Sequence, residues 1–476
     1  MKSNTKSNLI IIGILLALLP IFMPNLSYTT SINNKILDYN DVFNLDDKNL
    51  KISAVSGRIH IDNNWTAAKS AGICAGNGTY SEPYIIEDLV IDANNTGSCI
   101  LIENSSVYFK IENCTLYNSE YRIYPDYGFR DWTGGIKLYN CSNGILINNN
   151  CSFNYIGIYL LNCIDITVSA NNASDNYHGI YLTYVGDDDA LYKYTTQNII
   201  MGNTASFNTR DGIRLGGGKY NVVSGNTANN NGDYAAGIYL VNSDDNIISG
   251  NTANNNYRTG IDLQLYNNNN NLSGNVANSN GVDGIRIFRS FNNKISGNTL
   301  INNDANGISL AEGDDNIISG NTANYNLDGI KLANSDDNTI TGNNATNNDS
   351  WGLSLNNCND HLILGNNISY NNFMGLYLWG SDGNTITGNT VKNNTDFGIY
   401  LNTSNYTTVS GNILIGNDEC ITEINCRGNI FSDNGDCTYG RGNGEPIIPG
   451  FSLFFLLGIL SVAAIILTKK EKKSKS

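Results

Sequence analysis

The chain is poor in cationic residues and in histidine. Its 476 residues hold 28 Lys and Arg against 43 Asp and Glu, for a formal net charge of −15, and only three His. So negative a chain repels phosphate groups, which argues against nucleic acid and anionic lipid surfaces as partners. No Cys-X-X-Cys pattern occurs among the ten cysteines, which argues against zinc sites and thiol redox chemistry.

Helical periodicity is missing as well. Apolar residues alternate over short runs such as Gly-Ile-Tyr-Leu and Asn-Ile-Ile-Ser-Gly-Asn, which predicts strands of about three to five residues. A leucine-rich horseshoe needs a helical segment in every repeat, so the sequence argues against that fold.

A glycine followed by an aliphatic residue recurs through most of the chain. These coil glycines lie about 22–25 residues apart, except for one long step, and such a period indicates a stack of similar units. A second series, the turn glycines, keeps step with the first, and each member precedes an asparagine. The coil glycines are Gly135, Gly157, Gly179, Gly212, Gly237, Gly260, Gly284, Gly307, Gly329, Gly352, Gly375 and Gly398. The turn glycines are Gly202, Gly225, Gly250, Gly274, Gly297, Gly320, Gly342, Gly365, Gly388 and Gly411.

These patterns predict an all-β fold, a right-handed single-stranded parallel β-helix with coils of about 22–25 residues. Successive coils would pair at about 4.8 Å, and inward Ile and Leu columns would form a continuous core. Asparagine fills two further columns, whose stacked amides we expect to bond each coil to the next. The first holds Asn203, Asn226, Asn251, Asn275, Asn298, Asn321, Asn343, Asn366, Asn389 and Asn412. The second holds Asn198, Asn221, Asn246, Asn270, Asn293, Asn316, Asn338 and Asn384, with His361 and Thr407 in its gaps.

An apolar segment also precedes the repeats. Lys2 and Lys6 come before the apolar run 9–19 and two prolines. This order predicts a secretory signal peptide, with an uncleaved anchor as the alternative. The predicted organisation starts with a signal peptide (1–28) and a linker (29–55), followed by a β-helix domain with an N-terminal cap (56–440).

A second apolar segment follows the repeats. After a linker (441–450), residues 451–468 are apolar and 469–476 are rich in lysine, as expected for a transmembrane or sorting helix and a basic cytoplasmic tail. The motif Pro449-Gly450-Phe451 resembles the sorting signal of archaeal surface proteins, in which a lipid replaces the tail. In either case we expect the repeat domain at the extracellular face of the membrane, anchored by its C-terminus.

Four cysteines are placed to pair between coils. Cys141 and Cys163 each lie six residues after a coil glycine, and Cys114 and Cys151 share another column. Stacked Cα atoms about 4.8 Å apart are within disulfide range, although parallel Cβ vectors would strain the bond. Disulfides are the favoured prediction in this oxidising compartment, and buried free thiols are the alternative.

The remaining cysteines of note lie near the end of the repeats. A disulfide among Cys420, Cys426 and Cys437 would protect the exposed edge of the last coil. Cys358 stands alone, and we expect it to be packed and reduced.

Several Asn-X-Ser/Thr triplets are candidates for exterior glycans. They include Asn64, Asn77, Asn104, Asn113, Asn271, Asn348, Asn367 and Asn402.

One outer column is the first candidate site. The residue two positions after each coil glycine should point outward, and this column is rich in tyrosine and cations. Tyrosine rings stack on sugar faces, and Arg pairs with uronate carboxylates, so the column predicts carbohydrate binding. The alternative is that tyrosine is simply a good exposed strand residue. The carbohydrate-binding candidates are Tyr159, Tyr181, Arg214, Tyr239, Arg286, Tyr377 and Tyr400.

The one long step between coil glycines is a candidate for chemistry. It inserts residues 183–194, beside His178, Tyr181 and Arg214. A uronate lyase or epimerase needs a base, an acid and a cation for the carboxylate, and these three residues are weak candidates for those parts. Any outer β-helix face supplies such groups by chance. A second insertion, 120–133, is aromatic and forms either a wall beside the column or a cap on the coil.

Carboxylates recur in one turn of successive coils. Asp245, Asp315, Asp337 and Asp360 precede members of the second asparagine column. Like charges about 5 Å apart repel unless a cation bridges them, so these residues are weak calcium candidates. The alternative is ordinary turn chemistry with screening by water and salt.

The columns resemble the repeats of NosD-type, carbohydrate-binding and sugar-hydrolase (CASH) β-helix proteins over residues 85–434. Segments 74–79 (Cys-Ala-Gly-Asn-Gly-Thr) and 83–88 (Pro-Tyr-Ile-Ile-Glu-Asp) are similar to the opening of such domains in archaeal surface proteins. The resemblance implies a secreted, surface-attached domain that engages polysaccharide. It carries no reaction, because the Asp-Pro-His-Asp motif of mannuronan epimerases has no match, the nearest segment being 175–178. The chain contains only three His and four Met, and this small number of potential ligands argues against copper binding.

The leading hypothesis is a non-catalytic, membrane-anchored surface protein that binds or scaffolds envelope polysaccharide or glycoprotein. A lyase, hydrolase or epimerase is the first alternative, and a structural spacer or adhesin is the second.

Overall fold

The computed structural model describes residues 54–120, 122–123, 130–185, 195–435 and 439–441. The chain divides into two units, Met1–Lys51 and Ile52–Ser476, and every described residue belongs to the second. The predicted signal peptide, the C-terminal helix with its basic tail, and most of the 183–194 insertion lie outside these ranges. Within them, no helix is long and apolar enough to span a membrane.

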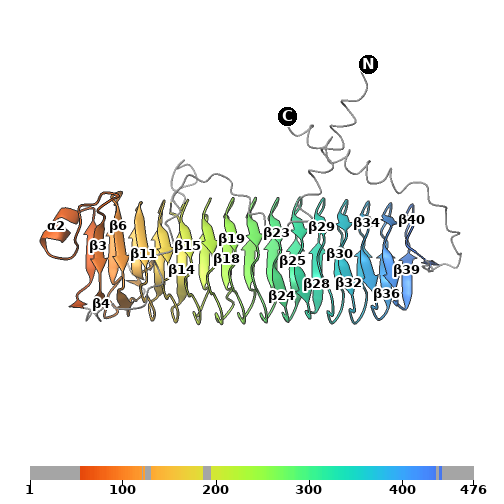
Figure 1. The fold of residues 1–476 in the computed structure, drawn as a ribbon, viewed down its shortest axis with the longest axis horizontal. Coiled ribbons are helices and arrows are strands. Elements are labelled where there is room, and N and C mark those ends of the chain that lie inside the picture. Colours follow the sequence, from red (N-terminus) through yellow and green to blue (C-terminus); the bar gives the residue numbers. More distant parts are fainter. Residues whose placement is uncertain (1–53, 121, 124–129, 186–194, 436–438, 442–476) are drawn as a thin grey trace, which may run out of the picture. The chain divides into compact units, whose positions relative to one another are not determined.

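The described residues form a parallel β-solenoid, as predicted, with one coil stacked on the next (Figure 1). Each coil contributes one strand to a 16-stranded sheet and one to a 15-stranded sheet. The 16-stranded sheet contains, in order, β2 (Ile59–Asp62), β5 (Ile100–Glu103), β10 (Gly134–Tyr139), β12 (Ile156–Leu161), β14 (His178–Thr183), β16 (Ile213–Gly216), β18 (Ile238–Val241), β20 (Ile261–Gln264), β22 (Ile285–Phe288), β25 (Asn306–Ala311), β28 (Asp328–Ala333), β30 (Leu353–Asn356), β33 (Leu376–Trp379), β36 (Phe397–Asn402), β39 (Glu419–Ile424) and β41 (Tyr439–Arg441). The 15-stranded sheet contains β3 (Tyr84–Glu87), β6 (Phe109–Glu112), β11 (Gly144–Ile147), β13 (Thr167–Ser169), β15 (Ile199–Met201), β17 (Val222–Ser224), β19 (Ile247–Ser249), β21 (Asn271–Ser273), β23 (Lys294–Ser296), β26 (Ile317–Ser319), β29 (Thr339–Thr341), β31 (Leu362–Leu364), β34 (Thr385–Thr387), β37 (Thr408–Ser410) and β40 (Ile430–Ser432).

A third face is built from shorter pieces joined by isolated bridges such as Val276↔Thr299 and Asn344↔Asn367. Its strands are β1 (Ala54–Ser56), β4 (Leu89–Asp92), β7 (Thr115–Tyr117), β24 (Thr299–Ile301), β27 (Thr322–Asn324), β32 (Asn367–Ser369), β35 (Thr390–Lys392) and β38 (Ile413–Ile415). One antiparallel pair, β8 (Arg122–Ile123) and β9 (Arg130–Asp131), lies in the 120–133 insertion. The inward Ile and Leu columns form a single core, in which residues such as Ile213 and Leu240 are fully buried.

A short helix closes the N-terminal end of this core. Helix α2 (Trp65–Ser70) places the Trp65 ring against Tyr84, with centroids 4.9 Å apart and planes within 4°. The indole Nε1 donates a hydrogen bond to Ser105 Oγ at 2.8 Å. Because the first coil of a solenoid has no neighbour on one side, this apolar ring covers core that would otherwise meet water.

The predicted asparagine columns are buried amide ladders. In most steps the Oδ1 of one asparagine accepts the backbone and side-chain N–H groups of the asparagine in the preceding coil, as Asn226 does from Asn203 at 2.9 and 3.0 Å. His361 takes part through Nδ1, which accepts the Asn338 backbone N–H at 2.9 Å. Burial lowers the pKa of His361 to about 4, so the ring stays neutral and accepts as an amide oxygen would. Its predicted structural role is confirmed.

A third ladder went unrecognised in the sequence. Its asparagines come just before the 16-stranded sheet, and their Nδ2 atoms lie against the coil glycines. A Cβ on Gly329 would stand 2.8 Å from Asn348 Nδ2 and 2.5 Å from the Gly352 carbonyl oxygen. Close approach therefore requires the coil glycines, whereas turn glycines such as Gly320 have open space and φ of +62°. The third ladder runs through Asn154, Asn176, Asn208, Asn231, Asn256, Asn280, Asn303, Asn326, Asn348, Asn371, Asn394 and Asn417.

Two sequence-based expectations need correction here. Asn348 is fully buried and its Nδ2 donates to Asn371 Oδ1, so it cannot carry an exterior glycan. The expected inter-coil disulfides are not formed either. Parallel Cβ vectors, the cost noted above, oppose the bond between stacked residues. Free thiols are found at Cys114, Cys141, Cys151, Cys163 and Cys426, and also at Cys358, which is buried as expected.

The state of the thiols follows from their burial. Burial raises the pKa of Cys114 and Cys358 to about 11, so both are neutral at physiological pH. Cys420 in the last coil is disulfide-bonded, and Cys437 lies outside the described residues.

Candidate functional site

The residue two positions after each coil glycine belongs to one unbroken column on the outside of the 16-stranded sheet. Strand register pairs every member with the next, for example Tyr181 with Arg214 and Tyr377 with Tyr400, which confirms the predicted alignment. We call it the outer column. It runs through Lys137, Tyr159, Tyr181, Arg214, Tyr239, Asp262, Arg286, Ser309, Lys331, Ser354, Tyr377 and Tyr400.

A second column lies beside it and was missed in the sequence. The residue directly before a coil glycine reaches the outer-column residue three positions later, as in Asp211–Arg214 (2.8 Å) and Asp328–Lys331 (3.8 Å). Simple strand alternation does not predict this pairing, because residues three apart normally lie on opposite faces. We call it the glycine-flanking column. It contains Ile156, His178, Asp211, Ala236, Thr259, Asp283, Asn306, Asp328, Trp351, Met374 and Phe397.

The N-terminal part of the outer column is covered. Tyr159 and Tyr181 are only 5% and 8% exposed, because Trp132 of the 120–133 insertion packs on them at centroid distances of 6.4 and 5.3 Å. These two rings are therefore not exposed for stacking on a sugar in this structure, and carbohydrate binding at them stays a prediction. The insertion was expected to form either a wall beside the column or a cap on the coil, and Trp132 acts as a cap. Sequence reasoning missed this because the contact joins a long loop to a distant coil.

The three catalytic candidates do come together beside this cap. The rings of His178 and Tyr181 lie 5.5 Å apart, and the Arg214 guanidinium lies 5.5 Å from the Tyr181 ring. Arg214 Nη1 donates to Asp211 Oδ2 at 2.8 Å, while His178 Nδ1 lies 3.7 Å from the same oxygen. Burial lowers the pKa of His178 to about 4, against the opposing pull of Asp211, so the imidazole is neutral at physiological pH.

The middle of the face holds cations and carboxylates together. Arg214 stacks on Tyr239 at 4.3 Å and is bonded to Asp211, and Lys331 lies beside Asp328. Burial raises the pKa of Asp262 to about 6, although the charge of its strand neighbour Arg286 opposes the shift. Since each cation has a carboxylate beside it, a polyanion would meet repulsion as well as attraction along this stretch.

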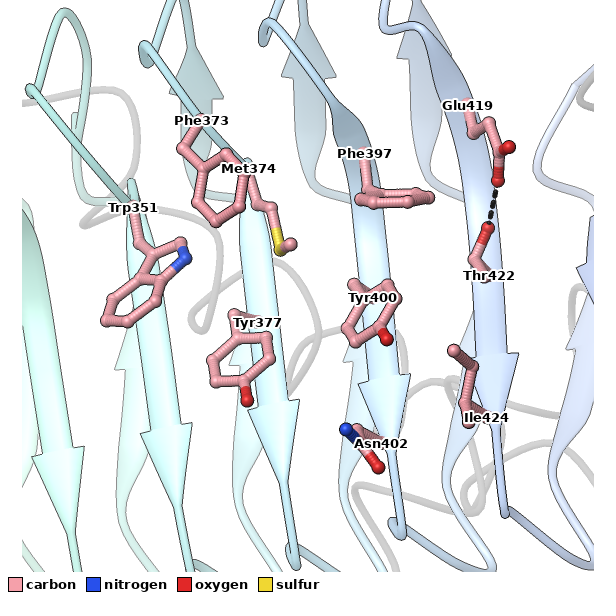
Figure 2. Close-up of a pocket in the computed structure, with 10 residues that line it drawn as sticks. All are labelled: Trp351, Phe373, Met374, Tyr377, Phe397, Tyr400, Asn402, Glu419, Thr422 and Ile424. Carbon is pink, nitrogen blue, oxygen red and sulfur yellow. Dashed lines mark hydrogen bonds between the residues drawn. The ribbon is translucent and has the colours of Figure 1, made fainter. Parts of the chain in front are cut away.

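The C-terminal part of the face is an accessible aromatic shelf, formed by Trp351, Phe373, Tyr377, Phe397 and Tyr400 (Figure 2). The Trp351 and Tyr377 rings stack with centroids 5.1 Å apart and planes 11° apart. Tyr377 and Tyr400 continue the row at 5.9 Å and 20°. Phe397 packs against Tyr400 at 4.8 Å. All five are half-buried or exposed, unlike the covered tyrosines at the other end.

A groove of about 480 Å³ runs over the shelf. Beyond the rings it is lined by Met374, Ile424 and three polar residues, Asn402, Glu419 and Thr422. Thr422 Oγ1 donates to Glu419 Oε2 at 2.6 Å, and Figure 2 shows this pair on the strand next to Phe397 and Tyr400. Tyr377 and Tyr400 were predicted; Trp351, Phe373 and Phe397 were not, although aromatic residues shortly before the coil glycines were the available signal.

The calcium candidates occupy left-handed turn positions. Asp245, Asp315, Asp337 and Asp360 have φ between 55° and 59°, a conformation that short polar side chains adopt readily. No group of three or more His, Cys, Asp or Glu side chains that could hold a metal occurs in the described ranges. Calcium binding at these positions stays a prediction.

Two family models match the chain. One, described as periplasmic copper-binding protein (NosD), matches residues 126–265 and 234–373. The other, described as right handed beta helix region, matches residues 50–191 and 313–445. No curated protein matches the sequence.

Solved structures are similar to this chain at low identity and with TM-scores below 0.5. The periplasmic alginate epimerase AlgG is 14% identical over 80% of this chain and 82% of its own, with a TM-score of 0.28. The A-module of a mannuronan C-5 epimerase of Azotobacter vinelandii is 14% identical over 75% of this chain and 91% of its own, with a TM-score of 0.38. The pre-mature gene product 12 of bacteriophage phi29 is 13% identical over 75% of this chain and 54% of its own, with a TM-score of 0.46. These likenesses assign no substrate and no reaction.

The copper in the family description finds no matching donor set in the described residues. His60 lies at the surface, 2.7 Å from Glu103, while His178 and His361 are buried in different coils and their pKa is lowered to about 4. The three imidazoles do not converge, and the described ranges contain no group of three or more His, Cys, Asp or Glu side chains that could hold a metal ion. The solenoid, its coil period and both family matches agree: the chain belongs to the NosD family of right-handed β-helix proteins.

Proposed function

We propose that the protein binds an extended polysaccharide along the outside of the 16-stranded sheet, without transforming it. The single observation that carries this proposal is the aromatic shelf with its groove. Three rings from adjacent coils, those of Trp351, Tyr377 and Tyr400, stack in one row, and polar groups of Asn402, Glu419 and Thr422 lie at one end.

The chemistry of the shelf fits a sugar. Aromatic rings bury the apolar C–H faces of pyranoses, and tyrosine adds a hydroxyl at its edge for hydrogen bonding. A pocket that combines apolar walls with a few polar groups is typical of small-ligand and glycan sites. Because the rings follow the solenoid axis, the glycan chain would run across successive strands rather than along one of them.

The preferred glycan is weakly charged or neutral. Glu419 is the acidic group in the groove, and the cations in the middle of the face are accompanied by Asp211, Asp283 and Asp328. A strongly anionic chain would gain little from such a face. This refines the earlier expectation of uronate recognition by Arg214 and Arg286.

The location of the protein is part of the proposal. The apolar segments 9–19 and 451–468 support secretion and anchoring at the extracellular face of the membrane, by a helix or a lipid. The shelf would then meet polysaccharide or glycoprotein of the cell envelope. If the shelf had no ligand, the rigid solenoid would still act as a spacer or adhesin.

Affinity electrophoresis of the purified full-length protein in gels containing neutral or uronate polysaccharides tests the binding. Tyr377→Ala/Tyr400→Ala should abolish retardation by the neutral glycan. The control variant Tyr220→Asn changes a ring that is 60% exposed at a turn away from the shelf, and it should be retarded like the wild type. Equal retardation of all three proteins would refute the shelf as the binding site.

A second candidate function is uronate lysis or epimerisation at the His178 cluster. It is favoured by the convergence of His178, Tyr181, Arg214 and Asp211 within one patch. A neutral imidazole can accept a proton, and an arginine can hold a carboxylate. Proton NMR of uronate polysaccharides incubated with the protein decides the matter. New unsaturated or epimerised signals that vanish in His178→Gln would establish an enzyme, and unchanged spectra would exclude this function for the glycans tried.

A further inference from the structure

A row of exposed aromatic rings follows one corner of the solenoid, outside the shelf. Phe153, Phe207, Tyr325 and Tyr370 each stand directly before an asparagine of the third ladder and are 66%, 61%, 56% and 56% exposed. We call them the corner rings. Each has a positive φ, between 57° and 61°.

The backbone conformation of the turn does not favour an aromatic residue at these positions. A left-handed conformation is unfavourable for a bulky side chain, whereas asparagine adopts it readily. Asparagine does fill the equivalent positions in other coils, at Asn230, Asn255, Asn302, Asn347 and Asn393, all with positive φ. Because the rings are mostly exposed, packing does not offset the backbone cost. The same combination occurs at Tyr220 and Tyr406 on another corner, so it is the spacing of the corner rings along one line, together with the strain, that points to a role outside folding.

Their positions are fixed by the solenoid. The backbone N–H of Phe207 donates to the Asn229 carbonyl at 3.0 Å, and that of Tyr370 donates to the Lys392 carbonyl at 2.9 Å. Phe153 and Phe207 are two ladder steps apart, as are Tyr325 and Tyr370. Two steps of the solenoid separate ring positions by about 9.6 Å.

More rings lie between these two pairs on the same side. Tyr234 and Tyr257 are 69% and 59% exposed, with centroids 6.2 Å apart. They line a groove of about 800 Å³ with Arg258 and Asp304. Apart from the Tyr234–Tyr257 pair, the described rings on this side stand singly, and polar turn residues such as Asn302 and Asn347 lie between them, so they form a spaced line rather than one patch.

This pattern selects the kind of partner. A protein interface concentrates its apolar residues in one buried patch, which the corner lacks. Exposed carboxylates at Asp233, Asp304 and Asp349 oppose a polyanion. An extended neutral polysaccharide offers an apolar sugar face at each repeat, and a two-coil interval is comparable to a disaccharide unit. Rings at such intervals also suit a flat, insoluble surface of parallel chains.

We propose that the corner rings form a second contact surface, for insoluble neutral polysaccharide lying along the solenoid axis. The proposal shares its ligand class with the proposed function but uses different residues. The shelf would bind single soluble chains, whereas the corner would hold the protein on the surface of packed chains.

Sedimentation of the full-length protein with microcrystalline cellulose and with chitin particles tests the corner. Tyr325→Asn/Tyr370→Asn should reduce the bound fraction about tenfold at limiting polysaccharide. Its melting temperature should be unchanged or higher, since asparagine suits the left-handed turn. Tyr220→Asn/Tyr406→Asn is the matched control. Those rings are 60% and 59% exposed, also have positive φ, and precede the second ladder.

The outcomes are distinct. Wild-type sedimentation by the corner variant would overturn the proposal, and so would a lowered melting temperature that accompanies the loss. The same loss in the control variant would show non-specific adsorption and would also overturn it. A shelf variant that still sediments, but is no longer retarded by soluble glycan, would separate the two surfaces. If the wild type binds soluble glycan and no particles, the corner proposal alone fails.

Discussion

Trp132 lies over Tyr181 with ring centroids 5.3 Å apart, and it reaches the ring of His178 at 6.3 Å. A residue from an insertion thereby turns part of an outer strand face into a small second core with Ile156 and Tyr159. The sheet is continuous, but its outer surface is divided into a covered N-terminal part and an open aromatic part at the other end. Only the open part can stack on a ligand without displacing protein.

Removal of the cap should destabilise the protein without affecting the shelf. Trp132→Ala exposes Tyr159 and Tyr181, and lost burial of this size costs about 2 kcal/mol. We expect a lower melting temperature by circular dichroism and unchanged retardation by neutral glycan. A fall in shelf binding would contradict the division of the face, because Trp132 and Tyr400 lie in distant coils.

The third ladder should carry more stability than its exposed neighbours. Asn371 Oδ1 accepts the backbone N–H of Asn348 at 3.0 Å, and its Nδ2 donates to Asn394 Oδ1 at 2.9 Å. Asn371→Ala leaves buried donors and acceptors unpaired, which costs about 2–4 kcal/mol. Asn372→Ala is the control, because its side chain is exposed, and it should stay within about 0.5 kcal/mol. Equal denaturation curves for the two variants would show that the ladder adds no net stability.

The two glycine series should respond differently to asparagine. Gly320→Asn should be tolerated within about 1 kcal/mol, since asparagine accepts the left-handed turn. Gly329→Asn should cost about 3 kcal/mol or more, because its Cβ would meet the Gly352 carbonyl and Asn348 Nδ2. Melting temperatures of both variants check this. A tolerated Gly329→Asn would mean that the coils can separate locally at low cost.

Features of the fold and the site that depend on local sequence spacing could be predicted from the sequence, whereas those that depend on contacts between distant segments could not. The outer column and two ladders were predicted, because strand alternation and a constant distance from Gly fix them. The third ladder escaped recognition because its distance to the coil glycine varies: Asn326 precedes Gly329 by three residues, Asn348 precedes Gly352 by four and Asn231 precedes Gly237 by six. The burial of Tyr181 depends on Trp132, which no repeat pattern could place. Two of the five shelf rings, Tyr377 and Tyr400, were predicted. Trp351 and Phe397 were missed, because a residue directly before a coil glycine reaches the outer column against strand alternation.

Acid should destabilise the solenoid through its buried histidines. The pKa of His361 is about 4 in the fold, against 6.5 for an unperturbed imidazole, because burial disfavours the charged ring. The unfolded chain therefore binds the extra proton between pH 6.5 and 4, and stability is lost as the pH falls through that range. A shift of this size corresponds to roughly 3 kcal/mol per group at most. Asp262 acts in the opposite sense, since its pKa is raised to about 6 and the fold gains stability as it is protonated.

His361→Asn isolates the histidine contribution, because asparagine is the usual residue of that ladder. Asn338 would keep its acceptor, as other coils show with Asn293 bonded to Asn316 at 2.8 Å. We expect equal or greater stability at pH 7 and a smaller loss between pH 6.5 and 4, measured by urea unfolding at several pH values. Thr407→Asn is the control, since Thr407 fills another gap of the same ladder without a titratable side chain, and its pH profile should follow the wild type. If His361→Asn loses as much free energy of unfolding between pH 6.5 and 4 as the wild type, the buried imidazole does not contribute to the acid sensitivity of the fold.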